Sequence, residues 1–319
     1  MKIVIPGGSG QIGTLLARTF QNDGQEVIEL SRRPSSNKPW RVVAWDARTL
    51  GAWTKELEGA DVVINLAGKN VNCRYTPENR RAILQSRVDS TRIIGQAIAQ
   101  ATRPPRVWLQ AGTATIYAHR YDAANDEATG ILGGAEGDAP DTWRFSIDVA
   151  KAWEREVEDA GPLPTTRKVV LRSAMTMSAE RGGVFDVLLR LVRIGVGGQS
   201  GDGRQFVSWI HETDFVRAIC WLIERDDVSG PVNLASPNPL PNAEFMGALR
   251  EAWGVRLGLP AAEWMLEIGA VFLRTETELI LKSRRVVPGR LLQQGFTFEF
   301  PRWPDAARDL CERWRHAAS

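Results

Sequence analysis

The most informative stretch of this 319-residue chain is KIVIPGGSGQIGTLLARTF, residues 2–20. Lys2–Pro6 is a short apolar run that is typical of a buried strand. The apolar residues of Gln11–Asp23 recur at helical spacing and stop at Gly24, a residue that commonly ends helices. A strand, a glycine-rich turn and a helix in this order predict the first unit of a parallel sheet with crossover helices.

Strand and helix patterns continue to alternate through the first half of the chain. Strands are expected at 26–30, 41–45, 61–66, 106–110 and 168–172, helices at 77–101 and 145–159, and a loop over 119–142. This alternation predicts an α/β fold with a Rossmann-type, doubly wound parallel sheet and helices on both of its faces. We assign residues 1–173 to this domain and expect residues 205–235 to return to it.

The regular alternation of strand and helix patterns ends at about residue 174. Helices are expected at 184–194, 214–224 and 243–253, strands at 205–211, 232–235 and 296–300, and two further helical patterns within 260–316. These mixed elements predict that residues 174–319 form mainly a smaller C-terminal α+β domain on the substrate side.

The glycine-rich turn itself consists of Gly7, Gly8, Ser9, Gly10, Gln11, Ile12 and Gly13. Gly7, Gly10 and Gly13 give a GxxGxxG spacing between a strand and a helix. The turn must be tight and its backbone must approach a pyrophosphate closely, which side chains at these positions would prevent. The helix that follows offers free N–H groups and its positive end to the phosphates. The context therefore predicts a dinucleotide site.

The end of the second strand bears on the identity of the dinucleotide. An NAD site expects an acidic residue there, which accepts hydrogen bonds from the ribose hydroxyls. Here Ser31 takes that place, followed by Arg32 and Arg33, and a guanidinium group suits a 2′-phosphate. The sequence therefore favours NADP over NAD. Asp46, which ends the third strand, has two open interpretations: it reaches the adenine amino group, or it caps the following turn.

Charge and cysteine content exclude several classes of function. The chain is 43% apolar and has a net charge of only +2, which gives no reason to expect nucleic acid or an anionic membrane as a partner. The scattered cysteines Cys73, Cys220 and Cys311 fit a reducing compartment, and three histidines without ligand spacing predict no metal site. With no apolar run of membrane-spanning length, the expected location is cytoplasmic.

The sequence resembles the extended short-chain dehydrogenase/reductase superfamily. More narrowly, it resembles the NAD(P)-dependent epimerase/dehydratase-like, YfcH-like group, which has a C-terminal domain of unknown function (DUF1731). GGSGQIG resembles the cofactor loop of the superfamily. Asn65, Leu66, Ala67 and Gly68 stand where the family closes its fourth strand under the nicotinamide ribose. SRVDSTRIIGQAI, residues 86–98, resembles the family's long helix, and SRRVVPGRLLQQGFTFEFP, residues 283–301, resembles the signature of the group.

The resemblance implies a catalytic set of Ser or Thr, a YxxxK pair and usually an Asn, which orient the substrate oxygen and exchange a proton with it. Thr113 matches the Ser/Thr position, and Tyr117 follows it at a position that often faces the substrate. The helix that matches YxxxK departs from the pattern: Ser146 falls at the tyrosine and Ala150 at the lysine. Arg87 stands at the asparagine position.

Other side chains are candidates for the missing chemistry. Tyr75 lies on the loop after the fourth strand and could supply a phenol, and Arg74, Tyr75 and Arg87 could bind an anionic substrate; packing of this loop is the alternative. The sequence predicts an NADP-binding oxidoreductase or nucleotide-sugar-epimerase-like protein that acts on a small-molecule substrate. The proton donor would be Tyr75, Tyr117 or a bound water.

Two further alternatives stay open. Loss of YxxxK favours a non-catalytic NADPH-binding sensor or regulatory protein. The family's members often pair through two long helices, so the chain is expected to be a monomer or a homodimer through residues 77–101 and 145–159.

Overall fold

The structure is a computed structural model that describes residues 1–137, 140–261 and 278–316. Most of the first helical pattern expected within residues 260–316 lies outside the described residues. In the described part of the chain, no helix has the length and apolar composition needed to cross a membrane.

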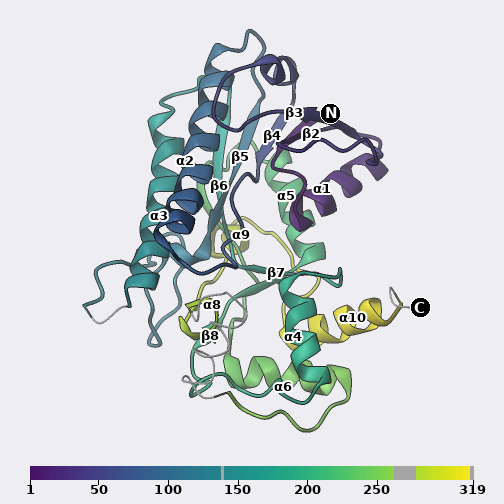
Figure 1. Cartoon of the computed structure of the whole chain (residues 1–319), viewed down its shortest axis with the longest axis vertical. Helices are drawn as coiled ribbons and strands as arrows, with labels where there is room; N and C mark the ends of the chain where they lie inside the picture. The colour runs from purple at the N-terminus through teal and green to yellow at the C-terminus, as the bar shows by residue number, and fades with distance from the viewer. Residues whose placement is uncertain (138–139, 262–277, 317–319) are drawn as a thin grey trace.

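One parallel sheet forms the upper part of the molecule in Figure 1. Its strands are β1 (Lys2–Pro6), β2 (Glu26–Ser31), β3 (Arg41–Ala44), β4 (Val62–Asn65), β5 (Val107–Thr113), β6 (Arg167–Ser173) and β10 (Gly230–Leu234). They lie in the order β10-β6-β5-β4-β1-β2-β3, and every neighbouring pair is parallel. The expected α/β Rossmann-type fold is confirmed, and β10 is the late strand that returns to the sheet.

Helices cover both faces of the sheet because successive side chains of a strand point to opposite sides. Ile3 and Ile5 of β1 pack in one cluster with Leu16 of α1 (Gln11–Asn22) and with residues of α5 (Glu212–Glu224). Val4 belongs to the cluster on the other face with Ile94 of α2 (Pro77–Gln100). Figure 1 shows α3 (Asp141–Asp159) beside α2 on that face.

A second core lies below the sheet. Residues of α4 (Val184–Arg193), α6 (Asn242–Trp253) and α10 (Trp303–His316) form it, with Trp303 stacked on Phe245 at 4.0 Å between ring centroids. Short pieces complete this region: β7 (Met175–Met177), β8 (Phe206–Val207), β9 (Trp209–His211), β11 (Leu240–Pro241) and α8 (Glu278–Leu281). The short helix α9 (Gly289–Gln293) instead packs through Leu291 into the core of the sheet. Two short 3-10 helices follow strands of the sheet: η1 (Ala52–Glu56) comes after β3, and η2 (Ala114–Ile116) comes after β5.

Two expected strands of the second half were wrong in form. The stretch 205–211 is divided at Ser208, where β8 pairs antiparallel with β11 and β9 pairs parallel with β7. The Ser208 hydroxyl instead bonds the backbone of Arg284 and Val286. Residues 296–300 form no strand because the N–H groups of Glu299 and Phe300 donate to the carboxylate of Asp214, at 2.7 and 2.8 Å.

The helix expected from residue 145 begins earlier. Pro140 occupies the N-cap position of α3, and Asp141 places a carboxylate in the first turn, where it is favourable beside the helix dipole. Phe145 and Ser146 of α3 line a cavity at the carboxyl end of β5.

Candidate functional site

The glycine-rich turn lies between β1 and α1 and is closely packed. Gly7 has φ +75°, a left-handed conformation, and a Cβ there would lie 2.6 Å from Ala67 Cα. A Cβ on Gly13 would overlap the backbone of Gly8. Neither position therefore accepts another residue without a shift of the main chain.

The open side of this turn fits a phosphate group. A Cβ on Gly10 would meet nothing within 4 Å, and Gly10 caps α1 without a side-chain hydrogen bond. Gln11 Nε2 is buried and has no hydrogen-bond partner among the described residues. An N–H donor without a partner, beside an uncapped helix N-terminus, suits a phosphate oxygen. Ser9 is exposed at the turn, and Ile12 packs partly into the core.

The segment after β4 packs against the glycine-rich turn on one side and against α2 on the other. Leu66 N donates to Pro6 O at 2.8 Å, and Ala67 N donates to the Asn65 side chain at 3.1 Å. A Cβ on Gly68 would lie 3.2 Å from Arg87 Cζ. The structure thus places Leu66 and Ala67 beside Gly7, because β1 and β4 are adjacent parallel strands that end at the same edge of the sheet.

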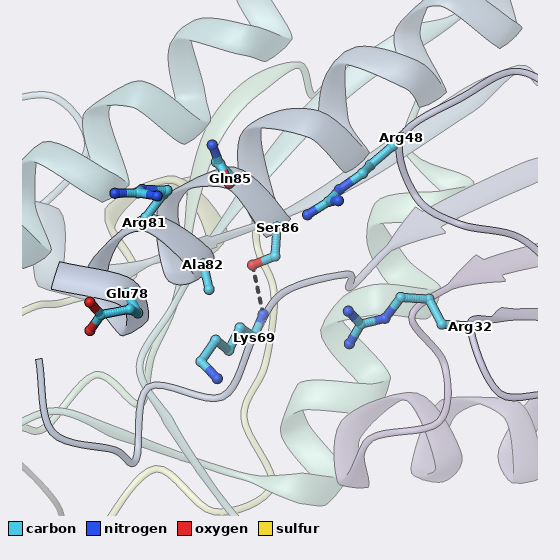
Figure 2. Close-up of a pocket in the computed structure, with 8 residues that line it drawn as sticks. All are labelled: Arg32, Arg48, Lys69, Glu78, Arg81, Ala82, Gln85 and Ser86. Carbon is cyan, nitrogen blue, oxygen red and sulfur yellow. Dashed lines mark hydrogen bonds between the residues drawn. The ribbon is translucent and has the colours of Figure 1, made fainter. Parts of the chain in front are cut away.

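A basic cavity of about 300 Å³ opens at the carboxyl ends of β2, β3 and β4. Its walls include Arg32 after β2, Arg48 after β3, Lys69 after β4, and Arg81, Gln85 and Ser86 of α2. Figure 2 shows the side chains of Arg32 and Arg48 extending toward the same space in front of Ser86, whose hydroxyl accepts from Lys69 N at 2.8 Å.

The positive charges of this cavity are only partly compensated, since Glu78 is the one acidic residue in its described lining. Arg32 makes no hydrogen bond or ion pair among the residues the structure describes, and Arg48 Nε lies 3.6 Å from Asp89. Ser31 is buried, and its hydroxyl bonds the backbone of Arg33. The side chain of Arg33 is not among the described residues that line the cavity. Sequence reasoning identified Arg32 and missed Arg48 and Lys69, although each follows a strand of the same parallel sheet.

Asp46 closes the turn that leads to Arg48. Its carboxylate accepts from Arg48 N and Thr49 N, both at 2.9 Å, and from the Thr49 hydroxyl at 2.6 Å. The hydrogen bond from the Thr49 hydroxyl is the main reason that the pKa of Asp46 falls to about 2. The structure therefore shows the capping interpretation, and an adenine contact stays a prediction.

An inner cavity of about 260 Å³ lies at the carboxyl end of β5, between α2 and α3. Its polar residues are Thr113, Thr115, Ser146, Tyr75, Arg87, Glu278 and Arg284, set among apolar and aromatic side chains such as Ile83 and Phe145. Glu278 and Arg284 come from the C-terminal region, and sequence reasoning missed both because no pattern links them to α3.

Tyr75 and Arg87 contribute differently to the inner cavity. Burial raises the pKa of Tyr75, with the nearby Glu278 carboxylate as a second cause. Arg87 Nη1 donates to the carbonyls of Lys69 and Ile83, both at 3.0 Å, and its guanidinium stacks on Trp153. Burial lowers the pKa of Arg87 to about 10. In this conformation Arg87 supports the loop after β4.

Thr113 and Tyr117 separate in the structure. Thr113 Oγ1 lines the inner cavity and accepts from Thr115 N at 3.1 Å. Tyr117 is missing from the described lining: its hydroxyl donates to Asn233 at 3.0 Å and accepts from Arg172 at 2.9 Å. Because these bonds hold the phenol in the core, the geometry does not support Tyr117 as the proton donor.

In the described ranges, no three His, Cys, Asp or Glu side chains are grouped as a metal ion would need. The three cysteines are all free thiols, and Cys311 is buried in the second core.

Comparison with known proteins places the chain among relatives. The NAD dependent epimerase/dehydratase family matches residues 3–132, and a domain of unknown function, DUF1731, matches residues 261–310. The cattle (Bos taurus) epimerase family protein SDR39U1 is 30% identical over 315 residues, which cover 97% of this chain and 99% of the relative. A Staphylococcus aureus (strain MRSA252) epimerase family protein, SAR0825, is 28% identical over 314 residues, which cover 97% and 99%.

Two solved structures are similar over nearly the whole chain. Human SDR39U1, crystallised with NADPH, superposes with a TM-score of 0.83 at 30% identity and covers 98% of this chain and 99% of its own. A nucleoside-diphosphate sugar epimerase from Corynebacterium glutamicum gives a TM-score of 0.73 at 28% identity, over 97% of this chain and 58% of its own. The chain therefore belongs to the NAD-dependent epimerase/dehydratase family and carries that family's cofactor domain together with DUF1731.

Proposed function

We propose that this protein is an NADP-dependent oxidoreductase that acts on a small carbonyl or carbinol compound. The observation that carries the proposal is the convergence of Arg32 and Arg48 on one cavity at the carboxyl ends of β2 and β3. Guanidinium groups are well suited to a phosphate monoester. The NADPH in the human relative's crystal structure supports the same cofactor here.

The residues present fit this cofactor along its length. The N–H groups at the start of α1, with Gln11 Nε2, would hold the diphosphate, and Arg32 with Arg48 would hold the 2′-phosphate. When bound, the cofactor supplies or accepts a hydride. Thr113, at the end of β5 in the inner cavity, would donate a hydrogen bond to the substrate oxygen and orient it.

The test of this proposal is NADPH oxidation by the pure protein with a panel of aromatic aldehydes, ketones and vicinal diketones. We expect at least one compound to be reduced. Thr113→Val should lower kcat by about 100-fold, the scale on which loss of one hydrogen-bond donor to a developing oxyanion reduces rates. Thr19→Val, which exchanges the same groups on α1 away from both cavities, is the matched control.

A second candidate is a sensor that binds NADPH without turnover. The observation in its favour is that Ala150 is buried where the family's lysine would stand. Tight NADPH binding together with no oxidation of NADPH across the whole panel would favour the sensor over the enzyme.

A further inference from the structure

We propose that Ser146 exchanges the proton with the substrate oxygen in the inner cavity, and that Glu278 is the acid–base group behind it. The pair would replace the tyrosine and lysine that α3 lacks. The assignment rests on the proposed oxidoreductase function, since it names the proton path of that same reaction.

The contact between the two residues joins distant parts of the chain. Ser146 lies on α3 and lines the inner cavity, and its hydroxyl donates to Glu278 Oε2. Glu278 begins α8 in the C-terminal region and is only 1% exposed. A buried carboxylate is costly unless it has hydrogen-bond and charge partners. Glu278 has a hydrogen-bond partner in Ser146 and a charge partner in Arg284, and both of these residues line the cavity.

The hydrogen bonds around Ser146 Oγ show which groups donate to it and which accept from it. A serine hydroxyl has one proton, and Ser146 donates it to Glu278, so the oxygen of Ser146 accepts from its other neighbours. The Tyr75 hydroxyl, 3.5 Å from Ser146 Oγ, is then the donor in that contact. With Glu278 ionised, the remaining acceptor capacity of Ser146 Oγ suits the hydroxyl of an alcohol substrate. With Glu278 protonated, the carboxyl O–H donates to Ser146 Oγ, and the serine proton is available to a carbonyl substrate. Tyr75 is thus a positioning residue for Ser146.

Several charged groups surround Glu278 and set its protonation. Arg284 Nη2 lies 3.4 Å from Glu278 Oε1. Lys282, from the same C-terminal segment, donates to Thr115 O at 2.8 Å. Arg87 and Tyr75 line the same cavity from α2 and the loop before it. The cations favour the carboxylate form of Glu278, and burial opposes it.

The proposed step balances in both directions. In reduction, the carbonyl carbon accepts a hydride supplied by NADPH, and its oxygen takes the proton of the Ser146 hydroxyl. Protonated Glu278 returns a proton to Ser146 Oγ, leaving an alcohol, NADP⁺ and the Glu278 carboxylate, which is reprotonated from solvent. In oxidation each transfer reverses. The carboxylate matters because a serine hydroxyl alone is too weak an acid to give up its proton near neutral pH.

The test uses the full-length protein, the carbonyl panel and the pH profile of kcat. We expect Glu278→Gln and Ser146→Ala each to lower kcat by about 100-fold, at the lower end for loss of general acid–base catalysis. Both variants should keep the Kd for NADPH within about twofold. In reduction, the wild-type rate should fall as Glu278 loses its proton at higher pH, and Glu278→Gln should lack this fall. Ser146→Thr, which keeps the hydroxyl, should recover most of the rate.

The controls separate this assignment from its alternatives. Glu156→Gln, a half-buried residue of α3 that pairs with Arg92 and lies outside the lining of both cavities, should change neither the rate nor its pH profile. If Glu278→Gln turns over at the wild-type rate with an unchanged pH profile, the assignment of Ser146 and Glu278 is overturned. The proposed oxidoreductase function would then still stand. Loss of turnover in Tyr75→Phe but not in Ser146→Ala would overturn it in favour of Tyr75. No turnover by the wild-type protein would overturn the proposed function, and the assignment with it.

Discussion

Single residues of the glycine-rich turn show how the sequence specifies the cofactor site. The spacing of Gly7, Gly10 and Gly13 was readable because only glycine permits such close approach of backbone to backbone. Gly13 is needed by the fold itself, since a Cβ there would overlap Gly8, whereas a Cβ on Gly10 would point into open space. Gly13 is therefore required for folding, whereas Gly10 leaves space for the cofactor.

This difference gives a prediction for the two glycines. Gly13→Ala should lower the free energy of unfolding by about 1–3 kcal/mol, the range for overpacking, as measured by urea denaturation. Gly10→Ala should unfold like the wild type but bind NADPH at least tenfold more weakly, because its methyl group would occupy the space of the diphosphate. Equal stability of both variants would contradict this account.

Elements were predictable where one local pattern sufficed. The strands and helices of the sheet follow from apolar runs and helical spacing. Residues 296–300, in contrast, alternate like a strand, yet their N–H groups donate to a single carboxylate on α5. Asp214 is fully buried and also pairs with Arg217 at 3.0 Å. Only the tertiary structure brings this carboxylate to the segment.

Asp214 should therefore stabilise the packing of the C-terminal segment on α5. We expect Asp214→Ala to lower the free energy of unfolding by about 2–5 kcal/mol, because it leaves two partly buried N–H groups and a guanidinium without their acceptor. Urea denaturation measures the loss. Asp305→Ala, in exposed pairs at the start of α10, should cost less than about 1 kcal/mol. A similar loss in both variants would argue against the role of Asp214.

At the scale of the whole molecule, the C-terminal region returns to the sheet domain at several points. Glu278 reaches Ser146 of α3, and Asp309 of α10 lies 3.0 Å from His211, the N-cap of α5. The resemblance identified this region, but no local pattern could place its residues beside α3 or α5, since the contacts span about a hundred residues of chain. Pairing through α2 and α3 into a homodimer stays a prediction.

The His211 contact makes stability depend on pH. The ring is fully buried, and Nδ1 accepts from Thr213 N at 3.1 Å, so the proton lies on Nε2. Burial lowers the pKa of His211 below 6.5, although Asp309 opposes the shift. The unfolded chain therefore binds more protons than the folded chain below pH 6.5, and stability is lost as the pH falls through that value.

The free energy of unfolding in urea should therefore be smaller at pH 5.5 than at pH 7.5, by at most about 1.4 kcal/mol per pH unit for this one histidine. His211→Asn should reduce that difference. His119, whose pKa burial also lowers, contributes with the same sign and stays in both proteins as a common background. An undiminished difference in the variant would rule out His211 as a source of the pH dependence.

The most direct test of the cofactor site is isothermal titration of NADPH and NADH into the wild-type protein, Arg32→Ala and Arg33→Ala. We predict that the wild type binds NADPH more tightly than NADH. Arg32→Ala should weaken NADPH by about 10- to 100-fold, the equivalent of one charge-assisted hydrogen bond, and leave NADH unchanged. Arg33→Ala, which lies off the cavity, should keep the wild-type ratio. Equal affinity of the wild type for NADPH and NADH, or a ratio that survives Arg32→Ala, would contradict the account.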